Sequence, residues 1–161
     1  MADPRSTDGL WNWGIAAYVD GPRVRAAISA VLDRPVVPLG AVPPEDGAVL
    51  CDVWHVGADF PTRVDCYLTT DEIAEVVVAS TVAVRLGHDV LLPDDTLNPT
   101  RFMLAEPDGT LRPVHADSAD TDDGTEHSNV RPCTGADPSC AAWPGCSRPP
   151  EGPDPQESAA A

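Results

Sequence analysis

A strand-like stretch that runs directly into a helix-like stretch, between Phe60 and Gly87, most constrains how this chain can fold. From Arg63 onward apolar and polar residues alternate, which is the period of two expected of a strand with one buried face. The residues expected on the buried face are Val64, Cys66 and Leu68. Thr69–Glu72 then combines hydroxyls with carboxylates, which favour the start of a helix. Residues 73–86 are apolar around much of a helix, and Gly87 suits its end. The stretch predicts a strand and a buried helix at the centre of the fold.

Similar patterns divide the rest of residues 11–116 into strands and helices. Strands are expected at 11–19, 36–39, 48–56, 62–68 and 88–92, and a further helix at 23–32. A hairpin should join 101–105 to 111–115 across Pro107-Asp108-Gly109, because proline fixes φ and glycine accepts a positive φ. This order predicts an α+β fold, a ferredoxin-like sandwich with both helices on one face of an antiparallel sheet, followed by the hairpin.

The composition of the chain changes near Ala116. Seven of the eight aromatic residues lie between Trp11 and Phe102, whereas the tail is rich in acids, prolines and small residues. Such a tail cannot bury enough apolar surface to offset the entropy of ordering it. We therefore expect a flexible N-terminus at 1–10, a single α+β domain at 11–116 and a disordered tail at 117–161.

The formal net charge of -16 restricts the partners of this chain, whose ten basic residues are all arginine. Nucleic acid is an unsuitable partner, because basic side chains must displace counterions from its phosphates. A basic protein partner fits, since opposite fields steer association, but the charge also serves simply to keep a protein soluble. No signal peptide and no apolar run of membrane-spanning length is apparent, so we expect a cytoplasmic protein without a membrane partner.

The sheet face opposite the two helices is expected to combine aromatic and charged residues. The partner-binding candidates on this face are Tyr18, Asp52, Trp54, Arg63, Asp65 and Tyr67. Tyr, Trp and Arg dominate the binding energy of protein interfaces, which favours a recognition surface. Alternatively, these rings pack under the loops or under the extra hairpin, because large aromatic residues are usually highly buried.

Neither a catalytic motif nor a metal site is evident in the sequence. It contains no recognisable nucleophile–base pair and no glycine-rich phosphate loop, so we expect no enzyme and no cofactor. Cys133, Cys140 and Cys146 have the spacing C-x6-C-x5-C, which in principle suits a soft metal. However, no fourth ligand stands at a zinc-like spacing, since His127 is six residues upstream of Cys133. The spacing therefore predicts no metal site.

Three short segments resemble a known group of proteins. They are Leu91-Leu92-Pro93-Asp94-Asp95-Thr96, Arg101-Phe102-Met103-Leu104 and the turn Pro107-Asp108-Gly109. Together they resemble the C-terminal part of small actinobacterial immunity-type proteins, which accompany secreted polymorphic toxins. The resemblance covers Leu91–His115 and carries over no functional residues. It implies an inhibitory binding protein without catalysis, whose partner is a basic toxin domain.

Three functional hypotheses follow. The first is a non-catalytic cytoplasmic binding or inhibitor protein of the immunity type, which uses its acidity and its aromatic sheet face to bind a protein. The second is a small-molecule-binding or regulatory module of ferredoxin-like fold that forms a homodimer through its sheet. The third is an enzyme with an unrecognised site, which requires a deep pocket with at least two convergent titratable groups.

Overall fold

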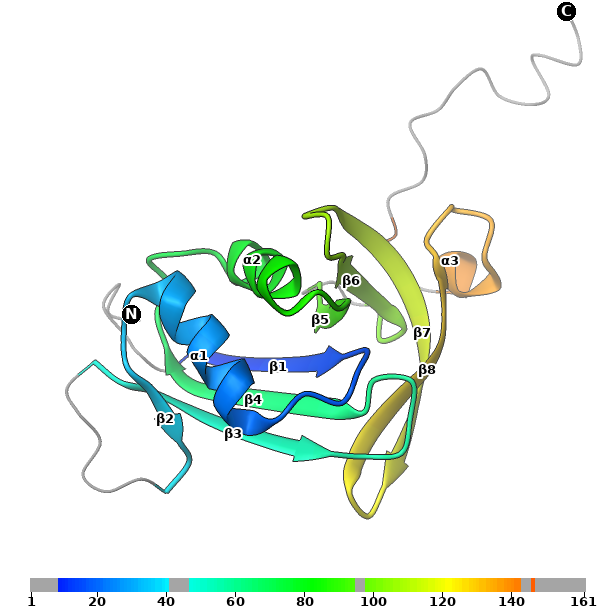
Figure 1. Ribbon diagram of the computed structural model, residues 1–161. Helices are drawn as coiled ribbons and strands as arrows, with labels where there is room; N and C mark the ends of the chain where they lie inside the picture. The colour runs from blue at the N-terminus through cyan, green and yellow to red at the C-terminus, as the bar shows by residue number, and fades with distance from the viewer. Residues whose placement is uncertain (1–8, 41–46, 95–97, 143–145, 147–161) are drawn as a thin grey trace, which may run out of the picture.

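An eight-stranded mixed sheet with two helices packed on one face forms the body of the protein in the computed structural model, which describes residues 9–40, 47–94, 98–142 and 146 (Figure 1). The strands are β1 (Gly9–Ile15), β2 (Val36–Pro38), β3 (Val49–His55), β4 (Thr62–Thr69), β5 (Val90–Pro93), β6 (Arg101–Ala105), β7 (Leu111–Thr121) and β8 (Gly124–Pro132). The helices among these residues are α1 (Gly21–Leu32), α2 (Glu75–Leu86) and the short α3 (Pro138–Ala142). The predicted α+β class is confirmed.

The strand order in the sheet is β2-β3-β4-β1-β5-β6-β7-β8. Each pair of neighbours is antiparallel except β2 and β3, which are parallel. Helix α1 joins β1 to β2, and α2 joins β4 to β5. Each helix therefore connects two strands that follow one another in sequence but are not adjacent in the sheet. Among the described residues, this arrangement leaves the opposite face of β3, β4 and β1 without a helix (Figure 1).

The two helices cover the sheet through their apolar sides. Pro22 stands in the first turn of α1, where its missing N–H costs nothing, and α2 ends at Gly87 with a φ of 74°. The fully buried side chains between the layers include Trp13, Ile28, Val64, Val78 and Val82. Trp13 also ties β1 to the start of α2, since its indole Nε1 donates to Glu75 at 2.9 Å. The predicted strand and helix therefore meet in the main core.

The junction between β4 and α2 differs from the prediction in two respects. Leu68 is not in the core: it is 41 % exposed and has a φ of 60°. The register explains this, because Tyr67 pairs with Leu10 and Thr69 with Gly9, so that β4 contains one extra residue, a β-bulge. Thr69 takes the buried position instead. Helix α2 begins at Glu75, after a turn in which the Thr70 hydroxyl accepts the Glu72 N–H, so the predicted start is also too early.

The prediction of disorder from Asp117 onward is wrong for residues 117–142. Strand β7 continues to Thr121 and returns as β8, and α3 follows. The apolar surface that supports this hairpin comes from the rest of the protein. A second core cluster on the helix-free side of the sheet consists of Phe60, Leu91, Phe102, Leu104, Val114 and Ala116, with Val130 packed against it. The rest of the predicted tail, 143–145 and 147–161, lies outside the described residues, as do residues 1–8 of the predicted flexible N-terminus.

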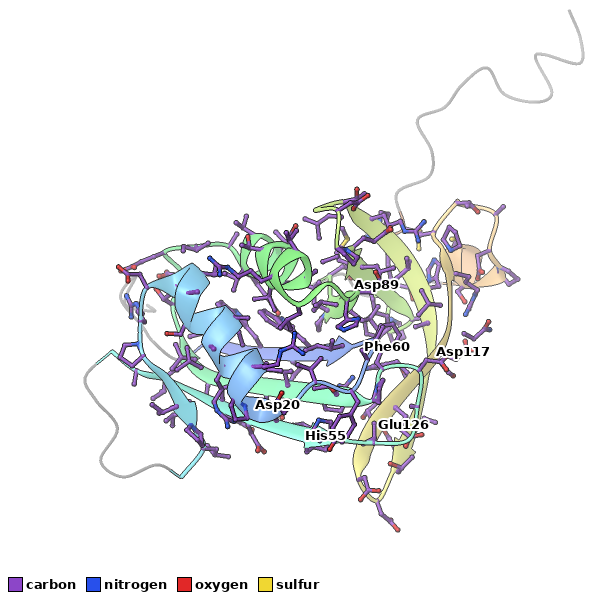
Figure 2. All side chains as sticks on the ribbon, in the orientation of Figure 1. Asp20, His55, Phe60, Asp89, Asp117 and Glu126 are labelled. Carbon is purple, nitrogen blue, oxygen red and sulfur yellow. The ribbon has the colours of Figure 1, made fainter. Side chains whose placement is uncertain are left out.

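The β7–β8 hairpin reaches back across the sheet toward β3. Its turn contacts Trp54, whose indole Nε1 donates to the carbonyl of Asp123 at 3.0 Å. The loop between β3 and β4 approaches the same hairpin, with Phe60 directed toward β7 (Figure 2). The β7–β8 hairpin therefore covers part of the helix-free face.

Candidate functional site

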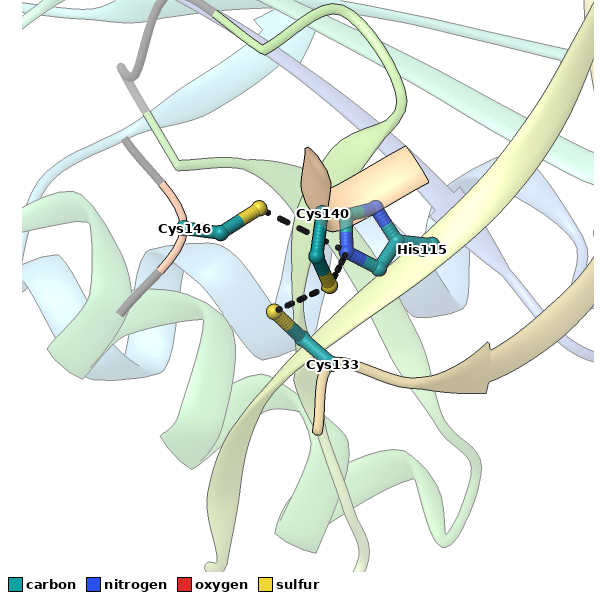
Figure 3. Close-up of side chains that lie close together, drawn as sticks. All are labelled: His115, Cys133, Cys140 and Cys146. Atoms are coloured by element: carbon teal, nitrogen blue, oxygen red, sulfur yellow. Dashed lines mark hydrogen bonds between the residues drawn. The ribbon is translucent and has the colours of Figure 1, made fainter. Parts of the chain in front are cut away.

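Four side chains of metal-ligand type converge near α3 (Figure 3). They are His115 on β7, Cys133 just after β8, Cys140 on α3, and Cys146. Their ligand atoms all lie within 4.8 Å of one another. His115 is fully buried, while the three cysteines are half-buried.

Strand pairing brings the histidine to the first cysteine. His115 pairs with Arg131 in the β7–β8 ladder, so Cys133, two residues beyond Arg131, emerges on the same end of the hairpin. The amide of Cys133 donates to the carbonyl of Pro113 at 3.1 Å, which extends the ladder to the cysteine itself. Residues that are 18 positions apart in sequence thereby become neighbours.

An ion pair and a helix cap position the second cysteine. Arg131 Nε lies 2.6 Å from Asp137 Oδ2, and this contact holds the pKa of the Asp137 carboxyl at about 2. Asp137 also accepts the Ser139 N–H at 2.9 Å and so caps the short helix that carries Cys140. The guanidinium of Arg131 donates in addition to the Ser139 hydroxyl at 3.0 Å. Cys140 is thus fixed relative to β8.

The separations between the ligand atoms fit a tetrahedral ion. Around zinc, with Zn–S of about 2.3 Å and Zn–N of about 2.0 Å, two sulfurs lie about 3.8 Å apart and a sulfur and a nitrogen about 3.5 Å apart. The Cys133 and Cys140 sulfurs are 3.8 Å apart, and Cys146 Sγ is 3.6 Å from His115 Nε2. Cys140 Sγ is somewhat closer to the same nitrogen, at 3.1 Å. The cluster can hold a small ion with little rearrangement.

A hydrogen-bond chain behind His115 sets the orientation of its ring. The Thr100 hydroxyl donates to Asn98 Oδ1 at 2.7 Å, so its oxygen is available to accept from His115 Nδ1–H at 3.0 Å. This assigns the proton to Nδ1 and leaves the lone pair of Nε2 directed at the sulfurs. Metal-binding histidines almost always donate their second N–H in this way.

Asn98 links this chain to the third cysteine. It is buried to all but 2 %, and its Nδ2 donates to Cys146 Sγ at 3.1 Å and to the carbonyl of Ser139 at 3.0 Å. Burial, together with the neighbouring Cys133, raises the pKa of the Cys146 thiol to about 11, against the opposing effect of the Asn98 hydrogen bond. A bound cation would instead lower the pKa of this thiol, because a coordinating thiol loses its proton outright.

A fourth side chain of ligand type does stand beside the three cysteines, although none has a zinc-like spacing to them in sequence. This side chain, His115, is 18 residues upstream of Cys133 and comes from the partner strand of the hairpin. His127, the histidine nearest to Cys133 in sequence, lies elsewhere and packs edge-on against Phe102. No local pattern in the sequence signals this partner, because His115 reaches the cysteines only through the pairing of β7 with β8.

The predicted binding residues divide into two groups. Trp54, Arg63 and Asp65 come together in one pocket beneath the β7–β8 hairpin. Asp52 and Tyr67 are half-buried beside them on β3 and β4, whereas Tyr18 belongs to the β1–α1 connection. Tyr18 is 71 % exposed and stacks on His55 with ring centroids 3.8 Å apart. The hairpin that contacts Trp54 is β7–β8 and not the predicted hairpin of 101–105 with 111–115.

Comparison of the chain with protein-family models, curated proteins and solved structures finds no match. Within the described residues, no helix combines the length and apolar character needed to cross a membrane. The functional assignment therefore depends on the chemistry of the sites themselves.

Proposed function

We propose that this protein binds one structural zinc ion through His115, Cys133, Cys140 and Cys146 and is a non-catalytic binding protein stabilised by that ion. The observation that carries the proposal is the convergence of three sulfurs and one imidazole nitrogen within 4.8 Å. The hydrogen bond from His115 to Thr100, which orients the free ring nitrogen toward the sulfurs, supports it.

The donor set favours zinc and a structural role. Three thiolates and one imidazole are a common tetrahedral zinc set, and soft sulfur ligands disfavour magnesium and calcium. Four protein ligands complete the tetrahedron and leave no position for a water or substrate, whereas catalytic zinc keeps one position open. Thiolates at this site require reducing conditions, which agrees with a cytoplasmic location.

The ion would stabilise the part of the chain with the smallest apolar core of its own. The hairpin beyond Ala116, the loop at 133–137 and residues 138–140 of α3 have mostly exposed or half-buried side chains. Binding of zinc to a structural site contributes about 10 to 16 kcal/mol at neutral pH, far more than such a segment gains from burial. We therefore assign the metal the role of fixing the C-terminal hairpin onto the sheet.

We further propose that the remaining body is a ferredoxin-like sandwich. Its supporting observation is the adjacency of β3, β4, β1 and β5, all antiparallel, with α1 and α2 in the crossover connections. In this description β2 is an added edge strand, and β6, β7 and β8 form an extension that ends at the metal centre.

The partner we propose is a basic protein, such as a toxin domain inhibited in the manner of immunity-type proteins. The net charge of -16 supports it, as does the group of exposed acids Asp120, Asp122 and Asp123 at the hairpin turn. Opposite charge accelerates association, and the effect weakens as salt rises.

Cobalt substitution tests the metal centre. Co²⁺ added to reduced, metal-free protein should give intense thiolate-to-cobalt absorption and tetrahedral ligand-field bands that saturate at one equivalent, and zinc should abolish them. Cys140→Ser should weaken these bands strongly, whereas Cys51→Ala, in the main core, should leave them unchanged. Absence of the bands in the unaltered protein would contradict the proposal.

Coexpression with the products of neighbouring genes tests the partner. We expect a basic protein to copurify at low salt and to be released at high salt. Neutralising the hairpin acids with Asp122→Asn and Asp123→Asn should weaken the complex, while Asp108→Asn at the distant β6–β7 turn should not. Self-association of the chain with no such partner would favour the dimeric regulatory module instead.

A further inference from the structure

A pocket of about 400 Å³ lies between the helix-free face of the sheet and the β7–β8 hairpin. Its floor comes from five adjacent strands, and its roof from the beginning of β8 at Gly124, Thr125 and His127. A volume of this size is within the range of small-molecule sites, roughly 300 to 1,000 Å³. The floor presents apolar surface from Trp54, Leu91 and Phe102.

Arg63 is the one positively charged side chain among the described residues that line this pocket. It is only 8 % exposed, and its Nε and Nη1 have no hydrogen-bond acceptor within the described part of the chain. The guanidinium reaches over β1 at Gly14, where Nη1 lies 2.9 Å from the position that a Cβ would take. Glycine at this strand position leaves room for the guanidinium.

Asp65, two residues further along β4, does not accept a hydrogen bond from Nε or Nη1 of Arg63. Asp65 raises the pKa of Arg63 by its charge, but burial of Arg63 lowers it by more. One oxygen of Asp65 already accepts a hydrogen bond from the Asn12 amide on β1. Two guanidinium nitrogens buried without an acceptor are unfavourable, since the cost of removing them from water is not offset. The arrangement therefore resembles a binding site whose counter-charge arrives with the ligand.

We propose that this pocket binds a small monocarboxylate with a flat apolar body, with its carboxylate on Arg63 and its body between Trp54 and Phe102. The planar guanidinium fork matches the two oxygens of a carboxylate. A single negative charge suits the site, because Asp65 lines the same pocket and repels a second one.

His127, in the roof, does not add a second positive charge. Burial and the charge of Arg63 lower its pKa to about 4, so its imidazole is neutral at pH 7. Its Nδ1 is already engaged with the Ser118 hydroxyl at 2.9 Å. The electrostatic character of the pocket thus differs from that of a phosphate site, which collects several cationic or amide donors.

Titration of the zinc-loaded full chain with benzoate, acetate and inorganic phosphate at pH 7 tests the inference. In two-dimensional NMR spectra, we expect benzoate to shift the Trp54 indole signal saturably with one-to-one stoichiometry. Acetate, which lacks the apolar body, should bind at least about tenfold more weakly than benzoate. Phosphate should give no saturable shift of the Trp54 signal. Arg63→Met should weaken benzoate binding by about tenfold or more, the expected loss of a charge-assisted hydrogen bond.

Two further variants keep the outcome interpretable. Thr125→Leu narrows the pocket at its roof without changing Arg63, and it should also weaken benzoate binding. This variant supplies the test if Arg63→Met fails to fold. Arg112→Met removes a half-exposed arginine paired with Glu106 on another surface, and it should bind benzoate as the unaltered protein does.

Equal benzoate affinity in the unaltered protein and in Arg63→Met, or no saturable shift at Trp54, would overturn the proposal. Saturation by phosphate but not by benzoate would overturn the assigned ligand class. The zinc content of every sample is measured separately, so a chain that binds benzoate but no zinc contradicts the proposed metal centre alone. A chain that binds zinc but no benzoate contradicts the pocket alone.

Discussion

Thr100→Val tests the hydrogen-bond chain that orients His115, with almost no change in side-chain shape. The substitution removes the acceptor for His115 Nδ1–H and the donor to Asn98 Oδ1. Asn98 keeps the Thr100 backbone N–H at 3.0 Å, so its amide should stay in place against Cys146. The substitution therefore mainly removes the hydrogen bond that orients the His115 ring. Removing such a supporting partner typically costs about 10- to 100-fold in metal affinity, or about 1.4 to 2.7 kcal/mol.

The assay is a competition titration for zinc against a chromophoric chelator, under reducing conditions without oxygen. Thr81→Val is the matched control, since it also removes one threonine hydroxyl bond, here to the Val77 carbonyl on α2, far from the cysteines. We expect the control to bind zinc as the unaltered protein does. Zinc affinity in Thr100→Val within twofold of that of the control would refute the role assigned to this chain.

Three further predictions concern the rest of the fold. Val82→Ala, at a fully buried position of α2, should lower the free energy of unfolding by about 2 kcal/mol in urea denaturation, whereas Val84→Ala, at a half-exposed one, should change it by less than about 0.5 kcal/mol. Leu68→Gly relieves the strain of a left-handed backbone conformation, so it should leave the free energy of unfolding unchanged or raise it by up to about 1 kcal/mol. Leu10→Gly, the control, should lower the free energy of unfolding by about 1 kcal/mol. Equal losses of stability in the two variants would argue against the bulge. His127 has its pKa lowered to about 4, so between pH 6.5 and 4 the unfolded chain binds the extra proton and the free energy of unfolding falls as the pH falls. His127→Gln should flatten this slope between pH 7 and 5, and an unchanged slope would contradict the assignment.

Local periodicity was sufficient to predict the elements of the main core. The alternation from Arg63 to Cys66 and the apolar helix that ends at Gly87 depend on neighbours along the chain, and both are present. Leu68 was misplaced because a bulge is set by pairing with β1 and not by the residues of β4 alone. Periodicity therefore gave the faces of the elements but not the point where the register shifts.

Composition in isolation does not predict the ordered C-terminal part. Residues 117–142 contain few apolar side chains, but Val130 packs against the core cluster that contains Phe60 and Phe102 from the body of the protein. The same limitation hid the candidate metal centre, in which β7–β8 pairing supplies His115 to a cysteine 18 residues later. Both features depend on contacts between segments that are distant in sequence, and no local pattern contains them.

X-ray absorption at the zinc edge, on protein purified with zinc and shown to hold one equivalent, tests the central proposal most directly. We expect a first shell of three sulfurs at about 2.3 Å and one nitrogen at about 2.0 Å. Cys133→Ser should replace one sulfur by a lighter ligand or lose the metal. A first shell of nitrogen and oxygen only, or protein that holds no zinc after purification without chelator, would contradict the assignment of His115, Cys133, Cys140 and Cys146 as a zinc site.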